Sequence, residues 1–408
     1  MFAAPLNPTI SMLSFSSRRF LALSLTLLML TAVHAAPTLP GVGAAMQGAV
    51  DAHETAGAVT FVATKDKVLH LEATGFADYV AKKPMATDTL FWLASSTKPI
   101  TATAALMMQD EGKLSITDPV AKYIPAFAAL KTPSGKPANI TIQQLLTHTS
   151  GLADIKRPVY FASKNLTDVM NGYFSPLTPM LAEPGERWKY NSFGLDTVGR
   201  IVEIVSGKSY DVFLQERIFG PLGMKDTTFF PSDAQQPRLA IGYSRDRSGQ
   251  SMNVQAPTFG RPVRGQFPPV PGGGLFSTAS DLGRFGQMLL NRGNFEGRRY
   301  LSEASFKQMT TIHTGELLTG YSAGQMNHVL GWGLGVFIVR APHEGLTAPL
   351  SVGTFGHPGA WGTDMIVDPV KGVVYVMMIQ RSNLPDNFEN EPARVFVQAA
   401  DAALAKSR

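Results

Sequence analysis

Segments typical of β-strands lie near both ends of this chain, and the long stretch between them is typical of helices. The strand-like segments are residues 58–64, 68–73, 335–339, 363–367 and 373–380. They are rich in Val, Ile, Phe and Thr and are bounded by polar or glycine-containing turns, as strands usually are. This arrangement favours one sheet built from both terminal regions, with a helical lobe inserted between them. The short turn at residues 368–372 predicts that the last two strands pair antiparallel.

The helical segments are rich in Ala, Leu and Met or carry apolar residues at three-and-four spacing. They are residues 42–54, 100–110, 141–146, 195–205, 278–290 and 393–405. We therefore expect an α/β (α+β) fold in which a mainly antiparallel sheet is flanked by helices. The α/β lobe would comprise about residues 40–105 and 270–408, and the all-helical lobe about residues 106–269. Residues 244–271 are rich in Pro, Gly and polar side chains and predict a long surface loop.

The first 35 residues have the pattern of an export signal. Arg18 and Arg19 precede a short apolar run, and small residues follow up to Ala35. Cleavage after Ala35 would leave a single domain of residues 36–408 in the periplasm or outside the cell. The alternative is an uncleaved membrane anchor, for which the apolar run is short. The start could also lie at Met12, and the signal could use the general or the twin-arginine export route.

Composition excludes several classes of function. The net charge of the 408 residues is +5 and falls to +3 without the first 35, whose only charged side chains are Arg18 and Arg19. That balance is too small for a nucleic-acid-binding protein, and no basic stripe with interleaved aromatic residues is present. The chain has no cysteine, which excludes disulfides, a thiolate nucleophile and cysteine metal ligands. The histidines show no metal-ligand spacing, and no glycine loop for phosphate is present, so we expect no cofactor or metal.

Ser95 and Lys98 form a Ser-x-x-Lys pattern in the segment FWLASSTKP, at the start of a helix. Three-residue spacing brings both side chains to one face of a helix, one turn apart. A serine hydroxyl is a weak nucleophile until a base takes its proton. A lysine in a partly desolvated pocket releases its own proton more readily and can act as that base. Alone the pattern is weak, because a helix-capping serine with a solvated lysine gives the same letters.

Further segments strengthen this interpretation. They are residues 112–120 (GKLSITDPV), 145–152 (LLTHTSGL), 184–192 (PGERWKYNS), 221–227 (PLGMKDT), 273–282 (GGLFSTASDL) and 353–360 (GTFGHPGA). With the Ser-x-x-Lys pattern, they resemble the serine β-lactamase-related superfamily over residues 42–400. Its members include class C β-lactamases, family VIII carboxylesterases, DD-peptidases and D-aminopeptidases. The resemblance implies the β-lactamase/transpeptidase-like fold.

The resemblance also implies roles for individual residues. Ser95 would be the acylated nucleophile, and Lys98 would help to remove its proton. Tyr190 matches the tyrosine of the Tyr-x-Asn motif, which passes a proton between nucleophile, lysine and leaving group. The backbone N–H groups of Ser95 and Ala360 would form the oxyanion hole. The alternative for Tyr190 is a half-buried tyrosine with a structural role.

Four positions carry departures or secondary roles. Ser192 stands where the motif usually has Asn, which holds the lysine and contacts a substrate amide. His357 stands where class C β-lactamases carry Lys; it could stabilise a substrate carboxylate, hydrogen-bond Tyr190 or be structural. Gly359 would let the strand backbone lie against the substrate. His148 is expected to have a structural hydrogen-bonding role.

These observations predict an exported serine hydrolase that forms an acyl-enzyme on Ser95. Its substrates would be small esters, because an ester demands less of the weakened position at Ser192. The near alternative is a β-lactamase or a peptidase for D-amino-acid peptides. The remote alternative is a non-catalytic receptor for cell-wall fragments. The oligomeric state is left open.

Overall fold

The computed structural model describes residues 36–175, 177–249, 251–255, 260–319, 329–343, 347–384 and 390–406. The predicted signal at residues 1–35 lies outside this part of the chain. No helix of the described residues is long and apolar enough to cross a membrane.

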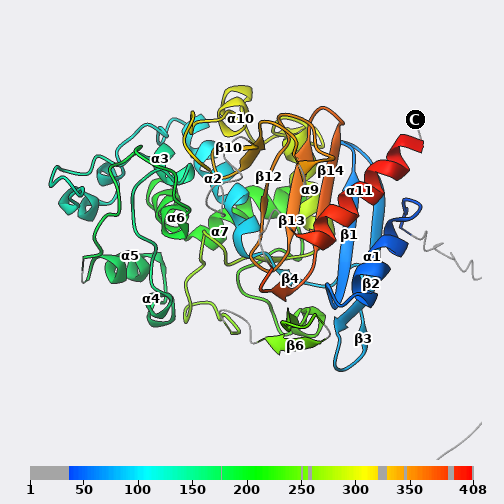
Figure 1. Ribbon diagram of the computed structural model, residues 1–408. Coiled ribbons are helices and arrows are strands. Elements are labelled where there is room, and N and C mark those ends of the chain that lie inside the picture. Colours follow the sequence, from blue (N-terminus) through cyan, green and yellow to red (C-terminus); the bar gives the residue numbers. More distant parts are fainter. Residues whose placement is uncertain are drawn as a thin grey trace, which may run out of the picture. The chain divides into compact units, whose positions relative to one another are not determined.

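An eight-stranded antiparallel sheet joins the two terminal regions of the chain (Figure 1). Its order is β10 (Leu330–Trp332), β11 (Phe337–Val339), β12 (Phe355–Pro358), β13 (Asp364–Asp368), β14 (Val373–Met378), β1 (Gly57–Ala63), β2 (Val68–Asp78) and β3 (Lys83–Pro84). The joint is the pairing of β1 with β14, in which Phe61 lies opposite Val376. The predicted fold class and the antiparallel pairing of β13 with β14 are confirmed.

Both faces of the central strands are covered by helices. In β1, Val59 and Phe61 belong to one apolar core, whereas Ala58 and Val62 belong to another on the opposite face. This alternation follows from the two-residue period of a strand. The helices α1 (Val42–Asp51) and α11 (Glu391–Lys406) cover one face, and α9 (Ala279–Leu290) covers the other (Figure 1).

The helical lobe lies on the α9 side of the sheet. It contains α2 (Lys98–Asp110), α3 (Ile142–Leu146), α4 (Arg157–Ala162), α5 (Leu166–Phe174), α6 (Ser192–Ser206), α7 (Tyr210–Leu214) and α8 (Gly220–Leu222). Helix α2 packs against α6, and Asn191 caps the start of α6 by accepting the N–H of Gly194. Helix α2 begins at Lys98 rather than at the expected Ile100, because Pro99 fits the first turn of a helix.

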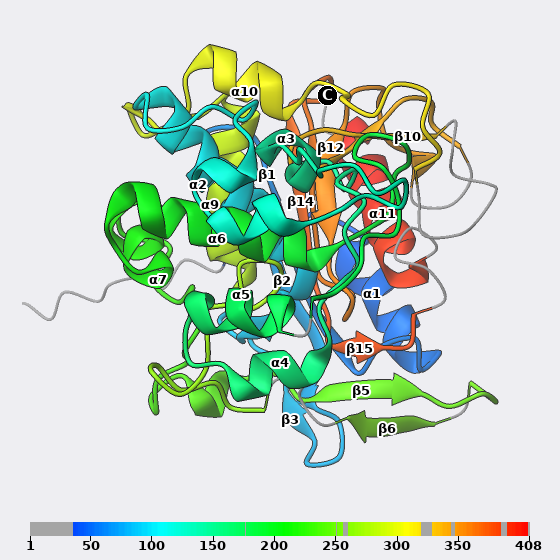
Figure 2. The same ribbon diagram turned by 90° about the vertical axis from the view of Figure 1, so that its left-hand side faces the viewer.

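The segment predicted as one long surface loop contains the end of one strand and the whole of a second. β5 (Gly242–Arg245) and β6 (Met252–Gln255) form a hairpin, and β5 also pairs in parallel with β15 (Arg381–Ser382) (Figure 2). The turn between them carries Asp246 and Gly249, which match hairpin chemistry. The polar composition concealed the strands because the hairpin lies at the surface, where polar side chains do not prevent pairing.

The remaining elements are short. They are α10 (Glu303–Met309), the strand pairs β4 (Phe91–Trp92) with β7 (Phe276–Ser277) and β8 (Asn294–Phe295) with β9 (Arg298–Arg299), and the 3₁₀ turn Ala94–Thr97. That turn connects β4 to α2 and carries the Ser-x-x-Lys pattern.

Candidate active site

Ser95 lies in the tight turn between β4 and α2. Ala94, just before it, has a φ of 46°, a backbone conformation that residues other than glycine rarely adopt. The neighbouring Ser96 is buried, and its Oγ donates to the carbonyl oxygens of His357 (3.0 Å) and Thr363 (3.1 Å). The turn is therefore held against strands β12 and β13, and Ser95 is left half-buried at the surface of a pocket.

The amine of Lys98 is fully buried and all three of its donor positions are used. Nζ lies 3.0 Å from the Oγ of Ser95, 3.3 Å from the Oγ of Ser192 and 2.5 Å from the carbonyl oxygen of Gly272. Ser192 thus contacts the lysine as the motif's Asn was expected to do, although only as an acceptor. The Gly272 carbonyl, which the sequence did not indicate, supplies the shortest of the three contacts.

Tyr190 approaches Ser95 from the residues just before α6. Its hydroxyl donates to the Oγ of Ser95 at 2.7 Å, and the Nζ of Lys98 lies 4.8 Å from the centre of its ring. The structure therefore brings together Ser95, Lys98 and Tyr190, which the sequence separates by up to 95 positions. In this arrangement a proton can pass between the serine, the amine and the phenol without rearrangement of the backbone.

An aromatic cluster surrounds the phenol of Tyr190. It consists of His148, Trp188, Tyr190, Trp332 and His357. The His148 ring is 4.4 Å from the Tyr190 ring and 5.2 Å from Trp332, centre to centre. The Nδ1 of His148 lies 3.2 Å from the amide nitrogen of Asn191, which is the structural role expected for it. Sequence reasoning missed Trp332, because no motif marks it.

Both histidines of the cluster are neutral. Burial and then the nearby charge of Lys98 lower the pKa of His148 well below its usual value. The same two causes, in the same order, lower the pKa of His357 to about 3. A buried imidazole that cannot be hydrated resists protonation, most of all beside an ammonium group.

The contacts of His357 support neither of the two functional roles considered from the sequence. Its Nδ1 donates to the carbonyl oxygen of Pro358 at 2.7 Å. Its buried Nε2 has no hydrogen-bond partner among the described residues, so it makes no hydrogen bond to Tyr190. The side chain is fully buried and its pKa is lowered to about 3, which disfavours a cationic contact with a substrate carboxylate. The fold of β12 turns this ring into the aromatic cluster and away from solvent.

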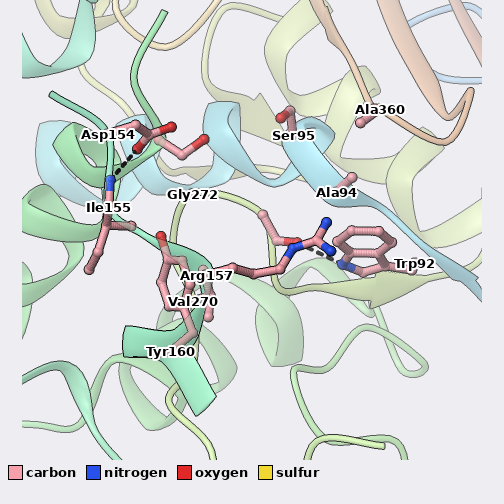
Figure 3. A pocket seen from close by; sticks show the side chains of 12 residues that line it. Trp92, Ala94, Ser95, Asp154, Ile155, Arg157, Tyr160, Val270, Gly272 and Ala360 are labelled. Carbon is pink, nitrogen blue, oxygen red and sulfur yellow. Dashed lines mark hydrogen bonds between the residues drawn. The ribbon is translucent and has the colours of Figure 1, made fainter. Parts of the chain in front are cut away.

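Packing within the protein gives a reason for Gly359 that the sequence did not indicate. A Cβ on Gly359 would lie 2.1 Å from the Oγ1 of Thr363 and 2.3 Å from the carbonyl oxygen of Leu93. The glycine therefore allows the end of β12 to pack against the segment that leads into Ser95. The next residue, Ala360, is exposed and lines the same pocket as Ser95 (Figure 3).

A buried pair of Asp196 and Tyr160, called here the Asp196–Tyr160 pair, lies behind Gly272 and was not predicted. The Oδ1 of Asp196 accepts the N–H of Gly272 at 2.8 Å, and its Oδ2 accepts the hydroxyl of Tyr160 at 2.5 Å. Burial raises the pKa of Asp196 to about 7, against the opposing effect of these two hydrogen bonds. Asp196 thus holds the backbone segment whose carbonyl holds Lys98. Its position one helical turn after Ser192 was the available signal.

A pocket of about 280 Å³ opens beside Ser95 (Figure 3). It is lined by Trp92, Ala94, Ser95, Asp154, Ile155, Arg157, Tyr160, Ser192, Val270, Gly272, Gly273 and Ala360. Trp92 is fixed by donating its indole N–H to the carbonyl oxygen of Gly273 at 2.7 Å. No group of three or more histidine and acidic side chains in the described part of the chain could hold a metal ion.

Comparison with known proteins places these features in a family. The model of the β-lactamase family matches residues 42–400. An uncharacterised protein of Mycobacterium tuberculosis is 36% identical over 399 residues, which cover 91% of this chain and 96% of that protein. Esterase EstB of Burkholderia gladioli is 28% identical, over 79% of this chain and 85% of its own length. The D-alanyl-D-alanine-carboxypeptidase/endopeptidase AmpH of Escherichia coli K12 is 28% identical, over 73% and 72%.

Solved structures with this fold include EstCE1, described as a hydrolase with promiscuous acyltransferase activity. It superposes with a TM-score of 0.74 at 23% identity, and the match covers 88% of this chain and 97% of EstCE1. Unliganded simvastatin synthase of Aspergillus terreus matches with a TM-score of 0.70 at 21% identity, over 90% and 98%. At these identities the likeness establishes the fold alone.

Proposed function

This chain belongs to the β-lactamase family of serine hydrolases, and on that premise we propose that it is an exported carboxylesterase that acts through an acyl-enzyme on Ser95. The substrates are small esters, and no cofactor takes part. The contacts of Ser95 with Lys98 and Tyr190 support an acyl-enzyme on Ser95. The neutral, buried His357 supports esters as the substrates.

The reaction uses the three side chains in sequence. Once the Lys98–Tyr190 pair has released one proton to solvent, the Oγ of Ser95 gives its own proton to the pair and attacks the ester carbonyl carbon. The backbone N–H groups of Ser95 and Ala360 stabilise the oxyanion. The tetrahedral intermediate then collapses, and the hydroxyl of Tyr190 returns the proton to the departing alkoxide. Water attacks the acyl-enzyme in the same way, gives its proton to the pair, and the proton returns to Ser95 as the acid leaves.

The preference for esters over β-lactams rests on charge. In the resemblance described above, β-lactamases place a lysine at the position of His357, where it pairs with the carboxylate of the lactam. His357 supplies no cation in the working pH range, because its pKa is lowered to about 3. A short ester has no carboxylate on that side and loses nothing. The relatives named as esterase and as carboxypeptidase leave the D-peptidase activity as the second candidate.

A substrate panel tests the activity. We expect p-nitrophenyl butyrate to exceed both nitrocefin and D-alanyl p-nitroanilide in kcat/KM. A fluorophosphonate probe should add one adduct by intact mass, absent from Ser95→Ala and retained in Ser206→Ala, a matched serine at the far end of α6. A faster nitrocefin reaction would replace the esterase by a β-lactamase. Labelling that persists in Ser95→Ala would place the nucleophile elsewhere.

Export is a separate part of the proposal, supported by the pattern of residues 1–35. Expression of the full chain in a Gram-negative host, followed by fractionation and N-terminal sequencing, tests it. A periplasmic protein that begins at Ala36 is the expected result. A membrane-bound protein of full length would favour the uncleaved anchor instead.

A further inference from the structure

The pocket beside Ser95 contains a cation that the proposed mechanism does not use. Arg157 lines the pocket and is exposed, and Figure 3 shows its side chain extending in the direction of Trp92. Arg261 and Arg264 form ion pairs with Asp233 and Asp211. In the part of the chain that the structure describes, the Arg157 guanidinium takes part in no such ion pair, and its N–H donors remain available to a ligand.

The position of Arg157 is tied to the proposed catalytic residues. Arg157 begins helix α4, and Tyr160 follows one turn later on the same face. The hydroxyl of Tyr160 donates to Asp196, and Asp196 in turn accepts the N–H of Gly272. Since Gly272 also holds Lys98, the helix that carries Arg157 is anchored to the same backbone segment as the lysine.

The other charged group of the pocket is Asp154, and one oxygen of its carboxylate is already engaged. Its Oδ1 accepts the N–H of Ile155 and the N–H of Phe193, each at 3.0 Å. Phe193 lies in the first turn of α6, where backbone N–H groups favour a negative charge. Asp154 is therefore directed at the backbone, whereas Arg157 is directed at the pocket (Figure 3).

The proposed reaction places this pocket on the acyl side of the substrate. In the proposed reaction Tyr190 returns the proton to the leaving alcohol, so the alcohol must depart on the side of Tyr190. Among the described residues, those that line the pocket include Ser95 and Ala360 but not Tyr190. The pocket thus receives the part of the substrate that stays on Ser95 as the acyl group.

We propose that Arg157 binds a carboxylate at the far end of the substrate's acyl group, so that half-esters of dicarboxylic acids are the preferred substrates. This inference rests on the proposed function and specifies its substrate class. A planar guanidinium matches a carboxylate with two parallel hydrogen bonds. The apolar surfaces of Trp92, Ile155 and Val270 face the methylene groups between the two ends of the acyl chain.

The test compares charged and neutral forms of the same acyl chain. The p-nitrophenyl half-esters of succinate, glutarate and adipate are assayed beside the same compounds with the free carboxylate capped as a methyl ester, each against an enzyme-free blank. We expect the wild type to favour the half-ester of at least one acid by about tenfold in kcat/KM. Because Arg157 is exposed, this preference should shrink as salt is raised.

Variants assign the preference to one residue. Arg157→Gln should lower the ratio of charged to capped substrate about tenfold, and Arg157→Lys should restore part of it. Lys156→Gln removes the same charge from the neighbouring residue, which does not line the pocket, and should keep both the ratio and the basal activity. An unchanged ratio in Arg157→Gln, or a wild type without preference for any half-ester, would overturn the inference.

A binding measurement separates this inference from the proposed function. Calorimetry with monomethyl glutarate and monomethyl adipate on Ser95→Ala, with and without Arg157→Gln, needs no turnover. About tenfold weaker binding in the double variant supports the carboxylate site, and equal or absent binding overturns it. Hydrolysis of the capped esters without preference leaves the esterase proposal standing. Failure to hydrolyse any ester overturns that proposal, and calorimetry still decides the role of Arg157.

Discussion

The aromatic cluster lies against the buried amine of Lys98, and the Asp196–Tyr160 pair is linked to the same amine through Gly272. Burial has opposite effects on the charge of the two regions. In the aromatic cluster, burial keeps His148 and His357 unprotonated and so adds no second positive charge beside Lys98. In the Asp196–Tyr160 pair, burial raises the pKa of Asp196 to about 7, so that its negative charge is present only above that pH. Desolvation is the largest cause in both regions, but it removes a cation from one and an anion from the other.

The difference shows how the site supports a lysine that must exchange its proton. The aromatic cluster packs apolar ring surface around Tyr190, and its members contact one another in tilted and edge-on ring pairs. The Asp196–Tyr160 pair contributes directed hydrogen bonds, and through Gly272 it sets the position of the Lys98 amine. The opposite pKa shifts give the two regions opposite dependences on pH, which experiments can separate.

The largest effect is expected at the two side chains that contact Ser95. Lys98→Met and Tyr190→Phe should each lower kcat by about a hundredfold to ten-thousandfold, the usual contribution of a positioned acid–base group. KM should change little, because neither side chain lines the substrate pocket. Steady-state kinetics with p-nitrophenyl butyrate measure this. Near-full activity of Tyr190→Phe would make the tyrosine a structural member of the aromatic cluster.

Asp196→Asn should change how stability depends on pH. The pKa of this carboxyl is 3.8 in its ordinary state and about 7 in the folded protein, so folding favours the protonated acid. Its contribution is present below about pH 4 and is lost as the pH rises through about 7. The size is on the order of 4 kcal/mol in the free energy of unfolding. An asparagine does not titrate, so urea unfolding of the variant should lack this loss between pH 4 and 7.

The matched control for Asp196→Asn is Asp168→Asn, a change on helix α5 that leaves Asp196 in place. It should retain the wild-type loss of stability over the same pH range. Equal slopes in wild type and Asp196→Asn would mean that the buried carboxyl stays ionised, and the contrast between the two regions would then fail.

A smaller effect of opposite sign is expected for His357→Gln. The pKa of His357 falls from 6.5 to about 3 on folding, so its contribution is present above pH 6.5 and is lost as the pH drops towards 3. At pH 4.5 this loss amounts to about 3 kcal/mol in the wild type. The variant should resist acid better between pH 6.5 and 4.5, as followed by urea unfolding. The loss should remain in His53→Gln, because that variant still contains His357, and its disappearance there would contradict the assignment.

Much of the site could be predicted because its residues carry local patterns. Ser95 and Lys98 meet through a spacing of three residues at the start of a helix, which brings them together wherever the helix packs. Tyr190 was found through its motif, and its contact with Ser95 places it where that motif implies. The roles of these residues in catalysis stay predictions until the variants are measured.

Other features depend on contacts that no local pattern encodes. Asp196 meets Tyr160 across 36 positions and Gly272 across 76. The glycine at 359 is set by a carbonyl oxygen of Leu93, on a distant segment. Such contacts follow from how the lobes pack, and the sequence offers only the residue types.

By itself, the sequence determined the strand segments at both ends, the helices between them and the family motifs around Ser95. These are encoded by spacing along the chain, which sets which side chains share a face. The tertiary structure alone decided the protonation of His357 and Asp196, the reason for Gly359 and the exposed position of Arg157 in the pocket. Burial and charge at a point in space come from every segment packed around it, and no stretch of sequence contains that information.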